Sequence, residues 1–196
     1  MARPREFDEE QALGAALEVF WDLGYEAASL SDLTERMGIN RPSLYAVFGG
    51  KRQLFLRCLN LYQENYYEGI RQLAARGGPG LGGLLAVFRQ VVEMGLDPRA
   101  RRGCLFVNTM AELAGRDAEL AQDALRFQER LAGLFAGVLG EAVERGELPA
   151  DTKIRANARF LTMALGGFSL LLKSGPPQEV LEDAVERTLA AVTGGA

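Results

Sequence analysis

The chain has 196 residues, of which 48% are hydrophobic and 24% are charged, so it can bury a core and is not expected to be disordered. It contains no histidine, which excludes imidazole metal sites, imidazole pH switches and catalytic triads that use His. Its net charge of −4 does not indicate a nucleic-acid-binding protein, so any such function has to follow from local geometry.

Composition predicts an all-α protein, because Leu and Ala supply 57 residues against 20 for Val, Ile and Thr. The first fifty residues predict three helices. Apolar residues that recur every three or four positions predict an amphipathic helix over 7–23 that ends at Gly24. A short helix follows, with Ser31 as its N-cap and Gly38 as its stop. A third helix, one to two turns long, is predicted over 40–48.

A longer helix is predicted to begin at Lys51 and to run to about residue 76, where a glycine-rich connector over 77–83 follows. We therefore expect about nine helices in two domains, a three-helix domain over 1–50 and a helical regulatory and dimerisation domain over 51–196. The five further helices are predicted over 84–95, 100–114, 117–145, 152–174 and 178–193.

The second and third helices, joined by a Gly-containing turn, form a helix-turn-helix whose second helix can enter the major groove of DNA. Its apolar residues must bury against the first helix, which leaves a short polar and aromatic face turned outward. Arginine can donate two hydrogen bonds to one guanine, Ser and Tyr can donate to phosphates, and Ala can contact a thymine methyl group. The outward residues are Arg41, Pro42, Ser43, Tyr45 and Ala46.

Two helix N-termini near this face are candidate phosphate sites. Lys51 opens the long helix, where unpaired amides and the helix dipole favour an anion, and Arg41 and Arg52 are expected nearby. Ser29 and Ser31, at the start of the second helix, are predicted to hold another phosphate in the same way.

A specific residue pattern accompanies this geometry. It consists of Gly24-Tyr25, Ser29-Leu30, Leu33, Met37-Gly38-Ile39, Ser43-Leu44-Tyr45, Phe48, Lys51 and Leu54-Phe55. Over roughly residues 7–55 this pattern resembles the DNA-binding domain of the TetR family of bacterial transcriptional regulators. The resemblance implies a dimeric repressor whose C-terminal domain binds a small-molecule inducer and releases a double-stranded operator. No cofactor is expected. Ala46 departs from the family, whose members often carry a larger residue there, so base contacts are expected to rest on Arg41 and Ser43.

Other functions stay open at this point. A helix-turn-helix also occurs as a plain packing unit, and a regulator of this fold can activate transcription. The composition is also compatible with a helical enzyme or with a helical adaptor that binds another protein. The absence of His, of a phosphate loop and of paired carboxylates argues against the enzyme.

The predicted helix 152–174 is apolar on nearly all sides, and such a helix has to be covered on every face. With helix 178–193 and the same two helices of a second copy, it is expected to form a four-helix bundle, which is the usual dimer interface of the family that the chain resembles. The alternative is that both helices complete a core within one chain.

The ligand site is predicted from a few polar residues inside apolar helices. Aromatic and Met residues at helical spacing are also ordinary core filler, and Asn108 has the alternative of bonding a neighbouring backbone group. The candidate ligand-binding residues are Phe88, Cys104, Asn108, Thr109, Phe127 and Met163; no metal site is expected.

Cys104 follows several arginines near a predicted helix start, and both features are expected to lower the pKa of its thiol. A redox or electrophile sensor of the same fold is therefore an alternative function. The other interpretation is that Cys104 and Cys58 are small buried hydrophobic residues.

The chain is expected to be cytoplasmic, without a membrane contact. Acidic residues follow Arg3 and Arg5 where a secretory signal needs an apolar stretch. The longest nearly apolar run, 160–172, has 13 residues, whereas a bilayer span needs about 20.

Overall fold

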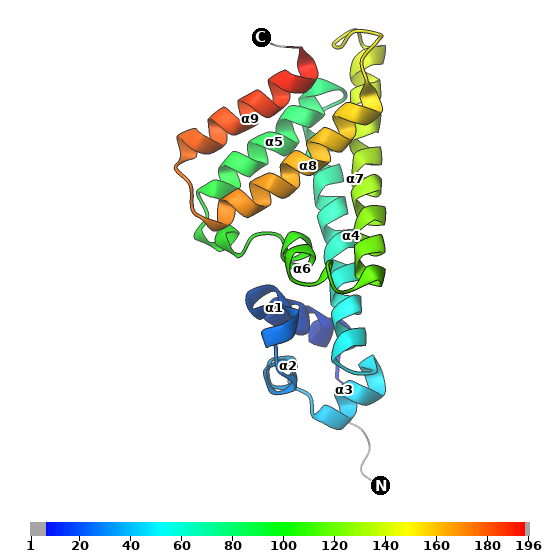
Figure 1. Ribbon diagram of the computed structural model, residues 1–196, viewed down its shortest axis with the longest axis vertical. Coiled ribbons are helices and arrows are strands. Elements are labelled where there is room, and N and C mark those ends of the chain that lie inside the picture. The colour runs from blue at the N-terminus through cyan, green and yellow to red at the C-terminus, as the bar shows by residue number, and fades with distance from the viewer. Residues whose placement is uncertain (1–6, 195–196) are drawn as a thin grey trace.

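The computed structural model describes residues 7–194, and over that range the chain is all-helical, with nine α-helices and one 3-10 helix (Figure 1). Arg3 and Arg5, on which the expectation about a secretory signal depends, lie outside the described residues. The helices are α1 Glu9–Ala27, α2 Leu30–Met37, α3 Arg41–Phe48, α4 Lys51–Gly77, α5 Leu81–Gly95, the 3-10 helix η1 Pro98–Arg102, α6 Leu105–Leu113, α7 Ala118–Glu144, α8 Ile154–Lys173 and α9 Gln178–Thr193.

The helices are arranged as a small head and a larger body (Figure 1). The head contains α1, α2, α3 and the first turns of α4, and α4 continues from the head into the body beside α7. In the body, α8 packs on α7, and α9 packs mainly on α5. Over residues 7–194, no helix combines the length and apolarity that crossing a membrane requires.

Helix α1 shows why the prediction of its end is only partly right. Gly24 leaves helical geometry at φ 80° and ψ 176°, as the predicted stop requires, but another turn follows as far as Ala27. A β-carbon at Gly24 would lie 2.9 Å from Oε2 of Glu112 in α6. That carboxylate accepts hydrogen bonds from the amides of Tyr25 at 3.0 Å and Glu26 at 2.8 Å, so α6 satisfies the backbone groups that the kink releases.

Helix α2 begins two residues earlier than predicted, because Ser29 rather than Ser31 is its N-cap. The Ser29 hydroxyl accepts from the Asp32 amide at 3.1 Å, and the Asp32 carboxylate accepts from the Ser29 amide at 2.8 Å, which completes a capping box. The other end is as predicted, with Gly38 in the left-handed region at φ 68°. Helix α3 also follows the prediction: the Asn40 side chain accepts from the Ser43 amide at 2.9 Å.

Two predictions in the body are wrong in detail. Helix α5 begins at Leu81 and not at 84, because the connector glycines let its backbone approach α4 closely: a β-carbon at Gly83 would lie 2.9 Å from the carbonyl oxygen of Ala74. The predicted helix 100–114 is divided into η1 and α6, because Gly103 adopts φ 70° between them.

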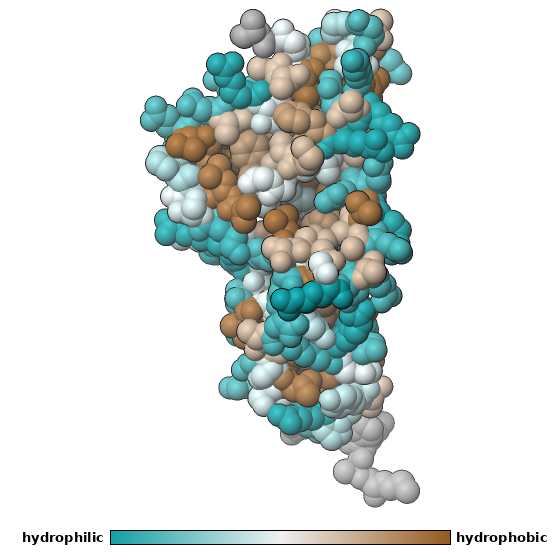
Figure 2. All heavy atoms as spheres, in the orientation of Figure 1, coloured by the Kyte–Doolittle hydropathy of each residue, from teal (hydrophilic) through white to brown (hydrophobic). Residues whose placement is uncertain are grey.

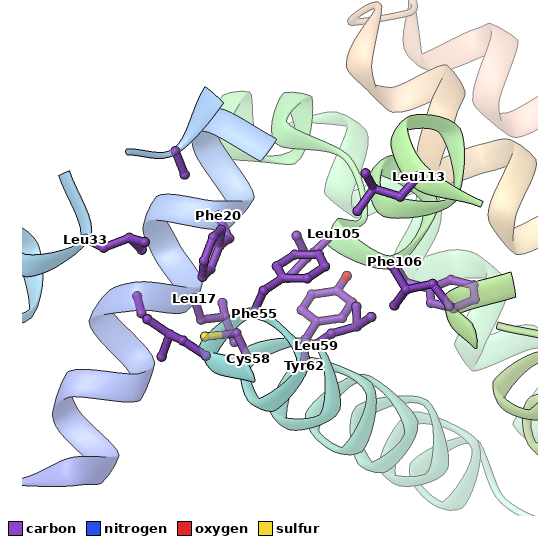
Figure 3. Packing of buried hydrophobic residues seen from close by; sticks show 14 of the residues in the cluster. Leu17, Phe20, Leu33, Phe55, Cys58, Leu59, Tyr62, Leu105, Phe106 and Leu113 are labelled. Atoms are coloured by element: carbon purple, nitrogen blue, oxygen red, sulfur yellow. The ribbon is translucent and has the colours of Figure 1, made fainter. Parts of the chain in front are cut away.

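The apolar core runs from the head into the body without interruption. One cluster joins α1, α2, α3 and α4 to α6 and the start of α7, and a second cluster fills the space between α5, α7, α8 and α9. Figure 3 shows Phe20 of α1 and Phe55 of α4 in this first cluster, with Leu105 and Phe106 of α6 beside them. The domain boundary between residues 50 and 51 stays a prediction, since α4 contributes to both clusters.

Candidate nucleic-acid interface

Helix α3 has one buried face and one exposed face, as its spacing predicts. Leu44 and Phe48 are 0% and 3% exposed and pack in the head core, whereas Tyr45 is 53% exposed. Arg41, Pro42 and Ala46 are exposed as well, and Ser43 is half-buried beside the N-cap. The exposed face is therefore a short surface that combines a cation, a phenol and small side chains, which is suitable for a DNA groove.

Arg41 is held in place by the neighbouring helix. Its Nη2 donates to the Ser31 hydroxyl at 2.8 Å, so Ser31 positions the guanidinium instead of capping α2. A guanidinium has five N–H donors in a planar fork, and this bond uses one of them. The others remain available for a bidentate contact with a base or phosphate.

Lys51 lies at an N-terminus that no side chain caps. Gly49 and Gly50 adopt φ 77° and φ 121° before it, and α4 has no side-chain capping bond among the described residues. The Lys51 ammonium donates to the Glu26 carbonyl at 3.2 Å and lies 4.7 Å from the centre of the Tyr25 ring. A cation thus lies near the free amides of the first turn, an arrangement that favours an anion.

The start of α2 offers less to a phosphate than the sequence suggests. The amide and hydroxyl of Ser29 are both engaged with Asp32, and the hydrogen bonds from Ser29 hold the pKa of the Asp32 carboxyl below its usual range. An ionised carboxylate therefore occupies the position predicted for a phosphate at Ser29. Ser31 keeps a hydroxyl hydrogen to donate, because its oxygen is the acceptor in the bond from Arg41.

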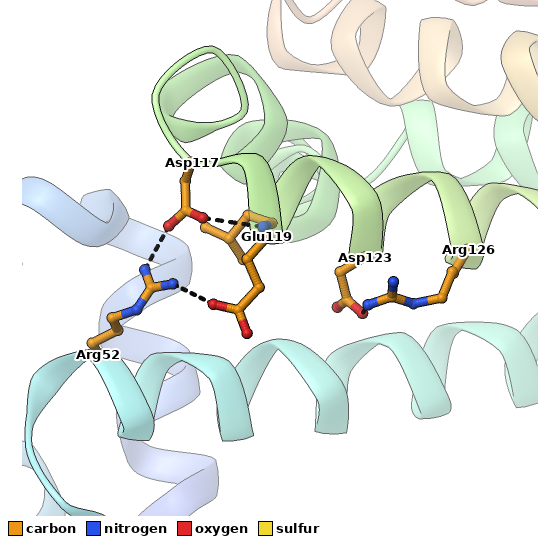
Figure 4. A network of polar contacts seen from close by, with 6 residues as sticks. Arg52, Asp117, Glu119, Asp123 and Arg126 are labelled. Atoms are coloured by element: carbon orange, nitrogen blue, oxygen red, sulfur yellow. Dashed lines mark hydrogen bonds and ion pairs between the residues drawn. The ribbon is translucent and has the colours of Figure 1, made fainter.

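Arg52 is not part of the cationic cluster predicted around Lys51. Its guanidinium reaches away from α3 to α7, where it pairs with Asp117 at 2.5 Å and Glu119 at 2.8 Å (Figure 4). The same pairing lowers the pKa of the Asp117 carboxyl. Arg52 therefore joins the head end of α4 to the body.

Comparisons with known proteins identify the chain. The family model "Bacterial regulatory proteins, tetR family" matches residues 12–58, and "Tetracyclin repressor-like, C-terminal domain" matches residues 80–187, more than half of the chain. The HTH-type transcriptional regulator YezE of Bacillus subtilis (strain 168) is 33% identical over 98% of this chain and 100% of its own length. The chain belongs to the TetR family.

Two further relatives of this TetR-family protein bear on its site. The HTH-type transcriptional repressor ComR of Escherichia coli (strain K12) is 30% identical over 95% of this chain and 90% of its own length. A cysteine mutant of the TetR-family regulator CifR, described as complexed with 26bp double-strand operator DNA, is 35% identical. That structure covers 96% of this chain and 99% of its own with a TM-score of 0.81. The protein is accordingly a DNA-binding transcriptional regulator and not an enzyme.

Two of the hollows in this TetR-family regulator share Cys104 as a lining residue. The larger one, about 440 Å³, lies between α1, α4, α5, η1 and α8, and the smaller one, about 210 Å³, lies between α6, α7 and α8. Cys104 lines both hollows, while Phe127 and Met163 line the smaller one. These three predicted ligand residues are therefore placed at cavities.

The other three predicted ligand residues line neither hollow. Phe88 is fully buried against Phe135 and Phe168, and Thr109 is buried in α6, so both are core residues. Asn108 donates to the Arg102 carbonyl at 2.9 Å and accepts from Lys173 at 2.9 Å, which is the structural role left open for it. Asn108 also lines a separate hollow of about 510 Å³ between α1, η1 and α6, and a ligand role for these three residues stays a prediction.

The expected acidic thiol at Cys104 is not found. Burial raises the pKa of Cys104, and the Tyr62 hydroxyl contacts its sulfur at 3.1 Å. Burial likewise raises the pKa of Cys58 to about 12. Both thiols are therefore protonated near neutral pH, which fits the interpretation of buried hydrophobic residues better than that of a reactive sensor.

Proposed function

We propose that this TetR-family regulator is a ligand-responsive repressor that binds a palindromic operator as a homodimer. Each subunit inserts α3 into the major groove of one half-site, and a small molecule bound in the body releases the DNA. The observation that carries the proposal is that α3 has a buried face and an exposed face: Leu44 and Phe48 pack in the core, whereas Tyr45 is exposed. The likeness to the repressor ComR over 95% of this chain supports repression as the direction of control.

The outward residues of α3, which are exposed except for the half-buried Ser43, take different roles in this proposal. Arg41 reads a base through its free donors, and Ala46 contacts a thymine methyl group. Ser43, Tyr45 and Pro42 lie against the DNA backbone, where the two hydroxyls donate to phosphates. Lys51 and the α4 amides bind one phosphate, and Ser31, more than Ser29, donates to another.

The dimer is proposed from an apolar stripe along α8. Phe160, Met163, Gly167 and Leu170 follow one another at three- and four-residue steps, and all four are exposed, Met163 by 73% and Leu170 by 61%. Figure 2 shows apolar side chains gathered on this side of the body. Exposed apolar surfaces of this kind mark interaction sites. In a two-fold dimer the stripe of one subunit packs against the same stripe of the second copy. The expected interface is a bundle of α8 and α9 from both subunits.

Release follows from a shift of population between two conformations. A ligand that binds better to the state in which the two heads do not match the operator lowers operator affinity in proportion to its preference.

Separate losses are expected when Arg41 and Lys51 are each replaced with Ala. On a selected operator duplex, Arg41→Ala should relax base preference at one position by about 1–3 kcal/mol, because its bidentate contact is lost. Lys51→Ala should weaken binding to all sequences alike and reduce the slope of log K against log salt by about 1. Fluorescence anisotropy over a salt series measures both.

The matched control is Arg89→Ala, which removes an exposed arginine of α5 in the body and should leave affinity and slope unchanged. Equal slopes for the Lys51→Ala variant and the Arg89→Ala control would contradict the assignment of Lys51 to a phosphate.

A further inference from the structure

The larger of the two hollows lined by Cys104, the larger cavity, is built partly by the DNA-binding head. Leu17, Glu18 and Trp21 of α1 line it together with residues of α4, α5, η1 and α8. A molecule bound there therefore touches the first helix of the head and not only the helices of the body.

The wall of this cavity is apolar and carries no free charge. Among the described residues that line it, Glu18 is the one with a formal charge, and its carboxylate pairs with Arg102 at 2.8 Å. The Tyr62 hydroxyl is bound to Cys104, and the Ser169 hydroxyl donates to the Leu165 carbonyl at 2.9 Å. An anion or cation would lose its hydration here without gaining a partner of opposite charge.

Two amide side chains of the wall are left for a ligand, while the Tyr66 hydroxyl of the same wall lies beside Ser169. Asn65 of α4 and Gln90 of α5 line the cavity, and within residues 7–194 neither side chain has a hydrogen-bond partner. A few such groups in an apolar wall fix the orientation of a ligand. They fit a neutral molecule with a hydrogen-bonding group on an apolar frame.

The contacts between α1 and η1 connect this cavity to the head. The Trp21 indole N–H donates to the Gly103 carbonyl at 3.0 Å, and the Arg102 guanidinium lies 4.2 Å from the centre of the indole ring. Arg102 also pairs with Glu18, so successive turns of one α1 face are attached to η1. Gly103 itself lines the cavity, which places the attachment in the cavity wall.

The neighbouring position on α1 belongs to the head core. Phe20 is fully buried against Phe55, and α1 packs on α2, which carries α3 through the turn at Gly38. A displacement of Trp21 by a ligand therefore moves the scaffold of the reading helix.

We propose that the larger cavity binds an uncharged, mainly apolar ligand and that this ligand acts on the head directly, by displacing Trp21 from Gly103. The proposal rests on the proposed function as a ligand-responsive regulator and names its ligand class and its route of control. Trp21 is the single tryptophan of the chain, so it also reports the binding.

The binding test uses two probes that share one apolar frame. N-phenyl-1-naphthylamine is neutral, and 8-anilinonaphthalene-1-sulfonate adds one negative charge to it. The neutral probe is expected to quench Trp21 emission by energy transfer and to bind at least about ten-fold more tightly than the sulfonate. Equal or tighter binding of the sulfonate would overturn the ligand class.

A pair of glycine variants locates the probe. Gly69 stands in the middle of the α4 stripe that lines the cavity, and a β-carbon there meets no other atom within 4 Å. The larger side chain of Gly69→Leu is therefore expected to occupy the cavity. Gly133→Leu is the matched control, since Gly133 is a helical glycine of α7 with equally open surroundings and lines neither hollow. Both changes favour the helix. Only Gly69→Leu should abolish energy transfer from Trp21; transfer that survives it would overturn the site.

The route of control is tested by coupling. Saturating neutral probe is expected to weaken operator binding by about five-fold or more, and operator to weaken probe binding by the same factor. Trp21→Phe keeps an aromatic ring but removes the N–H that the Gly103 carbonyl accepts. The factor by which saturating probe weakens operator binding, with saturation of each protein followed by direct excitation of the probe, should therefore fall. Full coupling in the Trp21→Phe variant, or none in the wild type, would overturn the route. If the protein bound no operator, the proposed function would fail, whereas the probe comparison would still decide the ligand class.

Discussion

Replacing both Met163 and Leu170 with Glu is expected to convert the dimer to a monomer and to lower operator affinity by about a hundred-fold or more. Both side chains lie on the exposed stripe of α8, and a carboxylate at each position places like charges across a two-fold interface. A monomer binds one half-site at a time, so it loses the gain from binding two linked sites. Light scattering after size-exclusion chromatography and anisotropy on the operator measure the two effects.

The matched control is Leu125→Glu on α7. Leu125 is 63% exposed, close to the 61% of Leu170, but it lies outside the α8 stripe. This control should remain dimeric and keep its affinity. A doubly substituted protein that stays dimeric with unchanged affinity would show that the stripe on α8 is not the interface.

Phe20→Ala is expected to lower the free energy of unfolding by about 3–5 kcal/mol. Phe20 is fully buried in α1, and its ring meets that of Phe55 edge-to-face with centroids 5.0 Å apart (Figure 3). Truncation leaves a cavity between α1 and α4 that the surrounding helices fill only in part. Because the same cluster includes Leu105 of α6, the loss affects the attachment of the head to the body as well. Urea unfolding followed by circular dichroism measures the change.

An aromatic residue of the same head serves as the comparison. Tyr45 is 53% exposed on α3, so Tyr45→Ala should change stability by about 0.5 kcal/mol or less while it weakens operator binding. A Phe20→Ala protein as stable as the wild type would contradict the packing of α1, and a strongly destabilised Tyr45→Ala protein would contradict the outward face of α3.

Local signals were sufficient to predict most of the helices. Periodicity and capping residues placed α3 and α9 closely, because both depend on residues that are near in sequence. The sequence does contain a signal for the true N-cap of α2. Ser29 and Asp32 have the spacing of a capping box, whereas Ser31 has no acidic residue three positions later. The sequence signal for the break at Gly103 is weaker, since a glycine inside a helical pattern is compatible with both a helix and a turn.

The site was predicted unevenly for a physical reason. The α3 surface follows from one short helix, so its exposed residues could be predicted from spacing alone. The larger cavity draws Trp21, Asn65 and Gln90 from three helices, and their meeting depends on tertiary packing that no local pattern specifies. Cys104 shows the same limit: nearby arginines suggested a low pKa, but burial, a property of the fold, raises it.

Selection of bound duplexes from a random pool tests the central claim, that α3 reads DNA in each subunit of a dimer. We expect the wild type to enrich a palindrome whose half-sites lie about one helical turn, or a multiple of it, apart. The Arg41→Ala variant should enrich the same spacing but lose preference at one symmetric pair of positions. Recovery of an unchanged sequence preference by Arg41→Ala, or no enriched palindrome for the wild type, would contradict the account.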